Sequence, residues 1–509
     1  YKEIDLLGRQ IERLARVRRY QEPGGHEGDL NQNVADRAAK PKKKPVRNHF
    51  DEEQLEQLKA NFEARCFGYQ KRWRAAMGER TRAILKSRQI GATFYFAFEA
   101  LVDAAETGHN QIFLSASKAQ AHIFRAYMVL FAAEVGVKLT GDPIILSNGA
   151  ELHFLGTNAR TAQGYHGNFY FDEFFWVYGF DVLKKVASGM AAQKKYRRTF
   201  FSTPSSVAHE AYKFWSGEEF NKGRAKADRV EIDISHRALQ GGKRCADGIW
   251  RDIVTIHDAE AEGCDLFDIA ELQRDNSVED FANLYECQFT DDAESQFPLA
   301  MMQGCMVDSW LVWRDFKPLT PRPYAGEVWI GYDPQESEKG DDAALVAIAP
   351  PRAPGGPFRL LERERMKGKD FQEQADAIRR MRDRYPGTSY IGIDKKGVGA
   401  AVFQLVRQWF PTVVGLEYSV IVKTRLVLHA QALIRRRRFQ YDAGWHDVTQ
   451  SFMAIRKVLT GSGDQVTYKA KRSAGIGHAD VAWAIMNALD REPIEGTEAA
   501  TSRSIMEIS

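Results

Sequence analysis

Residues 51–235 alternate between two kinds of hydrophobic pattern. Short apolar runs bounded by polar or turn-forming residues are typical of buried strands, whereas longer segments with apolar positions three and four residues apart are typical of helices. The helical pattern is clearest at residues 118–135. This alternation predicts an α/β fold with a doubly wound, mostly parallel sheet, in which ligands bind at the carboxyl ends of the strands. The predicted strands are residues 83–85, 111–115, 151–155, 169–172, 199–202 and 230–234.

A second series of elements begins near residue 328. Three consecutive strand-like runs come before a helical segment and a further strand, and an apolar helix is predicted near the end of the chain. Between the two series, residues 236–315 have a helical and weakly periodic pattern. The chain is therefore predicted to hold two α/β domains joined by a helical connector. The elements of the second series are the strands 329–333, 343–349, 358–365 and 390–394 and the helices 372–384, 423–434 and 480–489.

The composition excludes several classes of protein. With 44% hydrophobic and 27% charged residues, the chain has the composition of a typical globular protein, and its 509 residues are enough for several domains. The formal net charge is only +3, so a surface that binds nucleic acid must be a local patch. The 5 cysteines form no Cys-x-x-Cys pair, which argues against a zinc module and a disulfide framework. No apolar stretch approaches the roughly 18 residues of a membrane span, so none is expected.

The segment after residue 85 has the residue types of a phosphate-binding loop. In a P-loop, backbone N–H groups surround phosphate, a lysine reaches the β- and γ-phosphates, and a Ser or Thr hydroxyl binds Mg²⁺. Ala92 stands where the standard motif has lysine, and the basic residues lie upstream, so either of two side chains could supply the charge. The alternative interpretation is a plain strand-turn-helix. The predicted ATP-binding segment is Lys86, Ser87, Arg88, Gln89, Ile90, Gly91, Ala92 and Thr93, with Lys86 or Arg88 as the phosphate-binding base and Thr93 as the Mg²⁺ ligand.

Residues 168–173 have the acidic residues that accompany a P-loop in a nucleotide-hydrolysing site. The apolar run ends in Asp172 and Glu173, which fits a buried strand that delivers Asp172 to Mg²⁺ and Glu173 to the attacking water. The alternative is a solvated acidic turn at a strand end. Both segments in this order and spacing favour a nucleotide-hydrolysing site.

On these motifs, the chain resembles the large, ATPase-bearing terminase subunit of tailed bacteriophages, in particular the branch of temperate enterobacterial myophages and their prophages. The likeness covers about residues 50–490. Large terminases commonly carry the lysine at the front of the loop, which matches Lys86. The replacement at Ala92 departs from the standard P-loop pattern.

Two further segments carry the resemblance. Tyr69-Gln-Lys-Arg-Trp73 is similar to the family's adenine-reading motif, which implies that Gln70 contacts the base. Phe200-Phe-Ser-Thr-Pro204 is similar to the family's coupling motif, which implies that Ser202 and Thr203 sense the γ-phosphate.

Aspartates stand at the ends of three elements of the second series. Asp333 ends its first strand, Asp394 ends the fourth, and Asp480 opens the late helix. Three antiparallel strands, a helix and a parallel strand form the ribonuclease H-like arrangement, in which carboxylates from these places converge. Cutting a phosphodiester by the two-metal route needs hard oxygen ligands for two ions about 3.5 to 4 Å apart. The three aspartates therefore predict a nuclease site with Mg²⁺ or Mn²⁺, although each alone could be a turn, strand-end or helix-start acid.

Other residues carry weaker signals, each with an alternative. Asp341 and Asp342 are further metal ligands or part of a turn, and His478 assists the metal site or lies on the surface. Arg435 to Arg438 contact phosphate or form a solvated helix end. Arg160 is a candidate arginine finger that reaches a neighbouring subunit.

The predicted domains follow from these patterns and from the resemblance. Residues 1–50 form an N-terminal helical arm and linker, for which a contact with the small terminase subunit is expected. Residues 51–235 form the P-loop ATPase motor domain, 236–315 a helical subdomain, 316–495 the ribonuclease H-like nuclease domain and 496–509 a flexible tail.

The resemblance implies a viral DNA-packaging motor. It would drive double-stranded DNA through the portal protein into the procapsid with ATP and Mg²⁺, cut concatemeric DNA, and work as a homo-oligomeric ring in the cytoplasm of the infected bacterial host. A helicase-nuclease is one alternative, but it predicts a second motor core where the acidic series lies. The other alternative, suggested by Ala92, is a nucleotide-binding scaffold without turnover.

Overall fold

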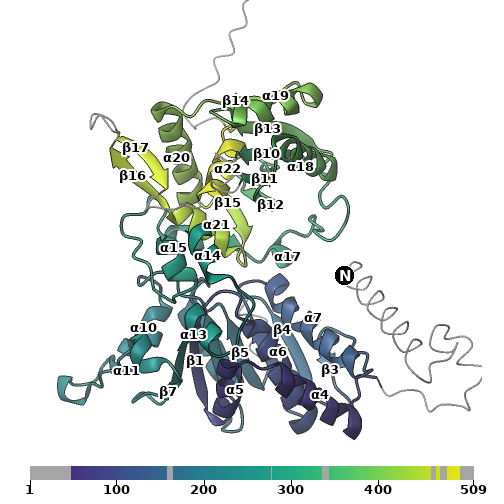
Figure 1. Cartoon of the computed structure of the whole chain (residues 1–509), viewed down its shortest axis with the longest axis vertical. Coiled ribbons are helices and arrows are strands. Elements are labelled where there is room, and N and C mark those ends of the chain that lie inside the picture. The colour runs from purple at the N-terminus through teal and green to yellow at the C-terminus, as the bar shows by residue number, and fades with distance from the viewer. Residues whose placement is uncertain are drawn as a thin grey trace, which may run out of the picture. The chain divides into compact units, whose positions relative to one another are not determined.

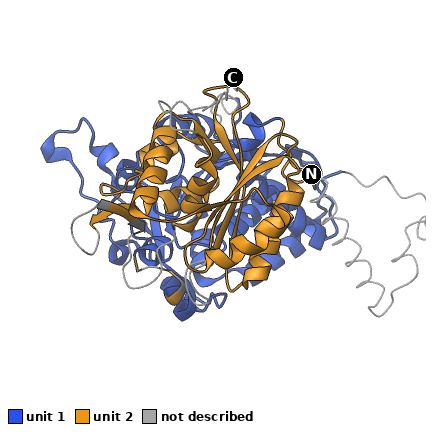
Figure 2. Cartoon of the chain, turned by 90° about the horizontal axis from the view of Figure 1, so that it is seen from above, with its two compact units in different colours: residues 1–273, 279–291, 308–314 blue, residues 274–278, 292–307, 315–509 orange. Residues whose placement is uncertain are grey.

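The computed structural model describes residues 47–157, 164–276, 278–334, 343–459, 466–470 and 479–492. The chain divides into two compact units (Figure 2). Unit 1 comprises residues 1–273, 279–291 and 308–314, and unit 2 comprises residues 274–278, 292–307 and 315–509. The expected N-terminal helix at 4–14, most of the 1–50 arm and the 496–509 tail lie outside the described residues.

Unit 1 is built on one sheet of eight strands in the order β3-β4-β2-β5-β6-β1-β8-β7. All its inner pairs are parallel, and only the edge strands β3 and β7 run antiparallel. The doubly wound α/β prediction is therefore confirmed for this unit, and the strands appear together in the lower part of Figure 1. The strands are β1 Thr81–Lys86, β2 Gln111–Leu114, β3 Ile144–Ile145, β4 Glu151–Leu155, β5 Asn168–Asp172, β6 Arg198–Ser202, β7 Lys243–Arg244 and β8 Trp250–Val254.

Helices cover this sheet and form its main core. Residues of α4, α6 and α7 pack with β2 and β4 in one apolar cluster that includes Phe62, Phe98 and Phe131. At its centre, the Trp73 and Phe96 rings are stacked with centroids 5.4 Å apart. The helices are α4 Glu52–Arg65, α5 Gly68–Ala75, α6 Ala92–Thr107, α7 Lys118–Glu134, α9 Phe180–Met190, α10 Ala211–Ser216, α11 Glu218–Asn221, α12 His236–Leu239, α13 Ile256–Ala261 and α17 Ser309–Val312; α14 Ile269–Asp275 and α15 Val278–Leu284 follow α13 in the chain.

The structure corrects one strand and one boundary. Residues 230–234 form no strand, and β8 joins the sheet beside β1 instead. The sequence pattern missed β8 because two of its buried residues are charged: Arg251 pairs with Asp247 at 2.6 Å, and Asp252 accepts a hydrogen bond from the Trp73 indole. Unit 1 extends beyond residue 235, the expected end of the motor domain, and includes residues 236–273, 279–291 and 308–314 of the expected helical subdomain at 236–315.

Unit 2 contains a mixed sheet of seven strands in the order β14-β13-β10-β11-β12-β15-β9. β10, β11 and β12 are antiparallel neighbours, and β13 runs parallel to β10, as the ribonuclease H-like prediction requires. The strands are β9 Met306–Val307, β10 Val328–Asp333, β11 Ala343–Ala349, β12 Phe358–Met366, β13 Thr388–Asp394, β14 Val414–Leu416, β15 Phe439–Asp442 and the hairpin β16 Ile455–Leu459 and β17 Val466–Ala470; the helices are α16 Leu299–Gln303, α18 Phe371–Arg384, α19 Gly399–Trp409, α20 Val420–Arg435, α21 His446–Met453 and α22 Asp480–Leu489.

Paired glycines let α22 lie directly on this sheet. Gly331 of β10 and Gly392 of β13 are register partners on neighbouring strands. A Cβ at Gly331 would overlap the Ala484 carbonyl, and one at Gly392 would lie 2.5 Å from the Asn487 carbonyl. Only glycine allows this close approach, which fixes the helix that begins at Asp480 against the two strands that end in Asp333 and Asp394.

Candidate active sites

The loop after β1 has the geometry of a phosphate-binding loop. Gln89 and Gly91 adopt positive φ angles of 61° and 75°, so the chain turns sharply before α6 begins at Ala92. The Ser87 and Arg88 N–H groups donate to the carbonyls of Val254 and Leu284 at 2.7 and 2.8 Å, which holds the first part of the loop in place. The first-turn N–H groups of a helix lack intrahelical partners, so the start of α6 suits an anion.

Lys86 and Glu173 come together at the carboxyl ends of their strands. The Lys86 ammonium donates to Glu173 Oε1 at 2.7 Å, and both side chains are buried. Glu173 Oε2 accepts from the Thr203 N–H and the Thr203 hydroxyl, each at 2.9 Å, and from the Ser202 hydroxyl at 3.0 Å. Because β5, β6 and β1 are adjacent and parallel, these groups meet at one edge of the sheet. Glu173 has φ 51°, a strained conformation of the kind that clusters at functional sites.

Asp172 has the surroundings of a carboxylate that exchanges its proton for a cation. Its Oδ2 accepts a hydrogen bond from the Ser115 hydroxyl at 3.5 Å, and its buried Oδ1 has no hydrogen-bond partner among the described residues. Burial, and then the neighbouring Glu173 charge, raise the pKa of Asp172 to about 8. A buried carboxylate with one oxygen unbonded fits a divalent cation, whose charge would replace that proton. Thr93, the predicted second ligand, lies half-buried in the first turn of α6.

Two side chains of α5 contact the phosphate-binding loop. Gln70 is buried: its amide donates to the Gly91 carbonyl at 3.4 Å, and its oxygen accepts from the Phe67 N–H at 3.1 Å. The Tyr69 hydroxyl donates to the Ile90 carbonyl at 2.6 Å. α5 therefore braces the loop, a role of Tyr69 that sequence reasoning missed.

Three other predicted loop residues have distinct surroundings. Ala92, at the standard lysine position, is buried in the core cluster. Arg88 is half-buried and Gln89 exposed. Thr203 also accepts a hydrogen bond from the Trp176 indole at 2.9 Å, so the candidate phosphate sensor is held from two sides. Neither Trp176 nor Ser115 was singled out from the sequence, because neither belongs to a recognisable motif.

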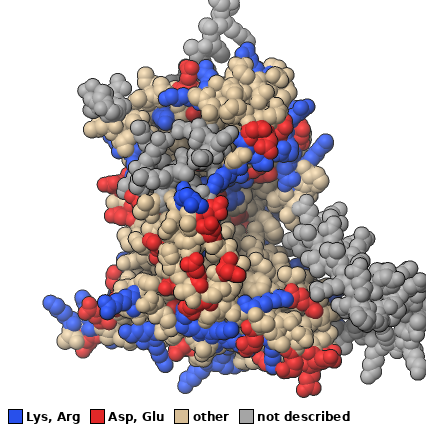
Figure 3. Space-filling model, viewed as in Figure 1, with Lys and Arg blue, Asp and Glu red and all other residues tan. Residues whose placement is uncertain are grey.

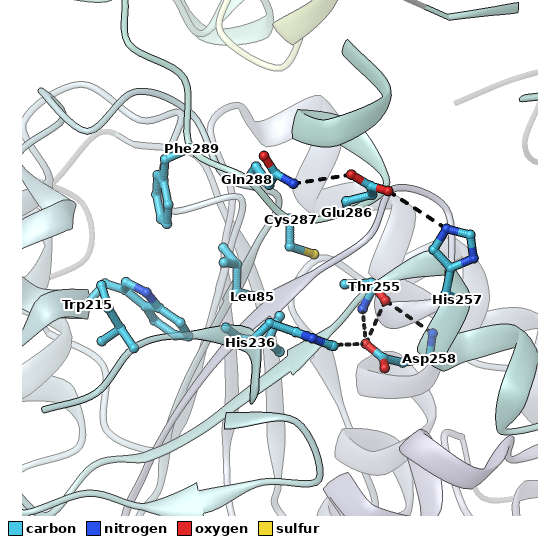
Figure 4. Close-up of a pocket in the computed structure, with 12 residues that line it drawn as sticks. Leu85, Trp215, His236, Thr255, His257, Asp258, Glu286, Cys287, Gln288 and Phe289 are labelled. Atoms are coloured by element: carbon cyan, nitrogen blue, oxygen red, sulfur yellow. Dashed lines mark hydrogen bonds and ion pairs between the residues drawn. The ribbon is translucent and has the colours of Figure 1, made fainter. Parts of the chain in front are cut away.

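A cavity of about 540 Å³ lies beside the end of β1 (Figure 4). Its wall includes Leu85, the residue before Lys86, and the aromatic rings of Trp215 and Phe289. On the polar side, Asp258 accepts from His236 at 2.6 Å and from the Thr255 hydroxyl at 2.6 Å, as the dashed lines in Figure 4 show. The polar wall is thus held by its own internal hydrogen bonds.

In unit 2 the three predicted aspartates are buried at the ends of neighbouring elements. Tyr332 and Ile393 are register partners, so Asp333 and Asp394, the next residues, end adjacent parallel strands. The Asp394 Oδ1 accepts from the Lys396 N–H at 2.9 Å. Burial raises the pKa of the Tyr418 phenol well above its ordinary value, and the charges of Asp333 and Asp394 raise it further, so this ring lies near both carboxylates.

Within the described parts of the chain, no three His, Cys, Asp or Glu side chains are grouped closely enough to hold one metal ion. The structure thus brings Asp333 and Asp394 to one sheet edge and fixes Asp480 on the covering helix, without a closed ligand cage among these residues. The donor set, carboxylate oxygens alone, suits Mg²⁺ or Mn²⁺. The other candidates Asp341, Asp342, His478 and Arg160 lie outside the described residues.

The arginine run after α20 separates into two kinds of residue. Arg435, Arg436 and Arg437 are exposed, whereas Arg438 is buried and pairs with Glu492 at 3.1 Å. Only the first three are exposed to solvent, where they could contact phosphate.

Lysine and arginine are interspersed with acidic residues on the face drawn in Figure 3. Among the residues that the structure describes, no helix has the length and apolar character needed to cross a membrane.

Comparisons with known proteins identify the family. Residues 83–303 match the family model "Terminase large subunit, T4likevirus-type, N-terminal", and residues 330–492 match "Terminase RNaseH-like domain". The chain is 55% identical over 498 residues to the "Terminase, ATPase subunit" of Escherichia phage P2, covering 97% of this chain and 84% of that protein. It is 44% identical over 457 residues to the "Probable terminase, ATPase subunit" of Haemophilus phage HP1, covering 89% and 74%.

Solved structures show a more distant likeness. The large terminase of bacteriophage HK97 is 15% identical, with a TM-score of 0.30, and the match covers 88% of this chain and 96% of that one. The assignment therefore comes from the family models and the two phage relatives.

Proposed function

Because the chain belongs to the terminase large-subunit family, as an ATPase packaging motor with a ribonuclease H-like, metal-dependent nuclease domain, we propose specific roles for the residues of its two sites. Lys86 binds the β- and γ-phosphates of ATP, and the N-terminus of α6 receives them. Asp172 and Thr93 hold Mg²⁺, which would neutralise phosphate charge. Glu173 orients the attacking water, and Thr203 and Ser202 sense the γ-phosphate. The contact that carries this proposal is the 2.7 Å pair of Lys86 and Glu173.

That pair also supports an order of events. The Lys86 ammonium has three N–H donors, and a phosphate would compete with Glu173 for its charge, so nucleotide binding would weaken the pair. Glu173 remains anchored through Thr203 and Ser202, which keep its carboxylate at the strand edge. The link from Glu173 to residues 202 and 203 gives a direct path from the hydrolysis site to the segment that follows β6. Gln70, packed on the Gly91 carbonyl, is proposed to report base binding to the loop.

In unit 2, Asp333, Asp394 and Asp480 are proposed to hold two Mg²⁺ or Mn²⁺ ions, which would activate water and stabilise the leaving oxygen. The substrate is double-stranded concatemeric DNA. The proposed partners are the small terminase subunit and the portal protein of the procapsid, with the chain acting as a homo-oligomeric ring in the cytoplasm of the infected bacterial host. The test of the whole function is ATP-dependent uptake of DNA into purified procapsids, protected from added nuclease.

Replacing Lys86 with alanine is expected to abolish ATP turnover, because it removes the cation from the front of the loop. The Arg88→Ala variant is the matched control, since it removes the other upstream cation, and it should retain most turnover. Both are measured as phosphate release with and without DNA. Near-normal turnover in Lys86→Ala together with loss in Arg88→Ala would transfer the phosphate-binding role to Arg88.

Binding of Mg²⁺ with a non-hydrolysable ATP analogue is expected to depend on pH through Asp172. Its pKa of about 8 means that the free site is protonated at pH 6.5, and the cation must displace that proton. Affinity should therefore rise about tenfold per pH unit up to about pH 8 and then level off. Calorimetry at pH 6.5 in two buffers of different ionisation enthalpy should detect the released proton. Asp172→Asn should remove the proton release, and equal wild-type affinity at pH 6.5 and 8.5 would contradict the prediction.

The same shift predicts a pH effect on folding. Because the pKa of Asp172 is raised in the folded protein, its protonation stabilises the folded state. This contribution to the free energy of unfolding is fully present below pH 3.8, the ordinary pKa of the carboxyl group, and is lost as the pH rises to about 8.

A further inference from the structure

Lys423 lies against two aromatic rings near the proposed nuclease site, although no sequence motif identifies it. Its ammonium is 5.1 Å from the Tyr418 ring centroid and 5.2 Å from the Trp483 ring centroid. The two rings are themselves 5.4 Å apart, so the cation lies against a pair of aromatic faces. Trp483 is one helical turn after Asp480 on α22, and Tyr418 lies near Asp333 and Asp394.

One of the two rings, Tyr418, is fixed by a chain of hydrogen bonds that runs through α22 to β10. The Tyr418 hydroxyl donates to Asn487 Oδ1 at 2.8 Å, and the Asn487 amide donates to the Tyr332 carbonyl at 2.9 Å. Tyr332 precedes Asp333 in β10. Lys423 is therefore held by a rigid frame that also positions the acidic residues.

The position is unfavourable for a lysine on helical grounds. Lys423 stands in the first turn of α20, where the helix dipole disfavours a cation, and that turn contains no acidic residue. A cation placed against the dipole suits an anionic substrate better than it suits helix stability.

We propose that Lys423 is a catalytic residue of the nuclease, and that its ammonium donates a hydrogen bond to a non-bridging oxygen of the scissile DNA phosphate. This inference rests on the proposed nuclease site. In the hydrolysis, water forms a bond to phosphorus, the bond from phosphorus to the leaving deoxyribose oxygen breaks, and that oxygen takes up a proton. Lys423 forms no covalent bond; it stabilises the negative charge that builds on the phosphate oxygens.

The test compares Lys423→Gln and Lys423→Arg with Lys457→Gln in the full chain. Lys457 is an exposed lysine of β16, so its substitution makes the same change in net charge. At saturating Mg²⁺, plasmid cleavage should fall about 100-fold in Lys423→Gln, as for loss of one charge-stabilising donor. It should fall less in Lys423→Arg and remain unchanged in Lys457→Gln. ATP turnover should be unchanged in all three.

Measuring metal affinity distinguishes a Lys423 side chain that contacts phosphate from one that only supports the local structure. Removing a cation beside the acidic site should leave Mn²⁺ affinity equal or higher, because one like charge is gone. Calorimetric Mn²⁺ binding to Lys423→Gln that is weaker than wild type would show that the lysine only supports the fold of the site, and cleavage within twofold of wild type would also overturn the proposal. Normal cleavage by Asp333→Ala, Asp394→Ala and Asp480→Ala would show that the proposed nuclease site is wrong. If these three variants lose cleavage and Lys423→Gln retains it, the nuclease site stands and only the proposed role of Lys423 is wrong.

Discussion

Glu173→Gln is expected to bind Mg·ATP at least as tightly as the wild type and to lose ATP turnover by a factor of about 10² to 10⁴, the usual contribution of a positioned general base. The glutamine oxygen can still accept from the Thr203 N–H and hydroxyl, so the local structure should persist. The neutral side chain no longer holds the Lys86 ammonium, which becomes available to phosphate. Affinity and turnover should therefore change in different directions.

Two measurements decide this prediction. Equilibrium binding of a fluorescent ATP analogue gives the affinity, and phosphate release in a single turnover gives the rate. Glu218→Gln is the matched control, because Glu218 is an exposed glutamate of the same unit. If Glu173→Gln lost affinity in proportion to turnover, Glu173 would hold the loop together rather than orient water.

The positions of strand-end residues were predictable from the sequence because a parallel sheet imposes them. The pattern of apolar runs located β1, β5 and β6, and their carboxyl ends carry Lys86, Asp172 and Thr203. The same logic placed Asp333 and Asp394 on adjacent strands of unit 2. In both units, strand direction alone places these residues at the carboxyl ends of their strands.

Contacts between distant side chains could not be predicted in this way. The Lys86–Glu173 pair joins residues 87 positions apart and depends on β6 lying between β1 and β5. The positive φ of Glu173 has no sequence signal, because glutamate is not a residue that usually adopts it. Lys423 was missed for a related reason: its site is formed by rings from a loop and from α22, which no motif connects.

The strand predictions were wrong where the apolar pattern does not follow the buried residues. β8 contains buried Arg251 and Asp252, each with a partner outside the strand, so a search for apolar runs passes over it. The apolar alternation at residues 230–234 predicts a strand, but the structure has no strand there. The predicted contact of Gln70 with the base stays a prediction, and no sequence pattern indicates that its amide is bonded to the Gly91 carbonyl.

Removing any one of Asp333, Asp394 and Asp480 is expected to lower metal-dependent plasmid cleavage by at least about 100-fold, because metal ligands contribute several kcal/mol to the transition state. Carboxylates that are brought together repel one another without a cation, so Mg²⁺ or Mn²⁺ would be needed to draw the three aspartates into one site. The losses should not add in double variants, since ligands of one site act as a unit.

ATP turnover should survive in all three variants, because Lys86 and Glu173 belong to the other unit. Plasmid cleavage is scored beside phosphate release for Asp333→Ala, Asp394→Ala and Asp480→Ala, with Asp383→Ala, an exposed aspartate of α18, as the control. Calorimetric Mn²⁺ titration of each variant shows whether metal binding falls together with cleavage. Full cleavage by two or more of the three variants would leave a motor whose acidic unit serves to dock DNA or a partner, whereas loss of cleavage with intact ATP turnover means that translocation and cutting use separate chemistry within one chain.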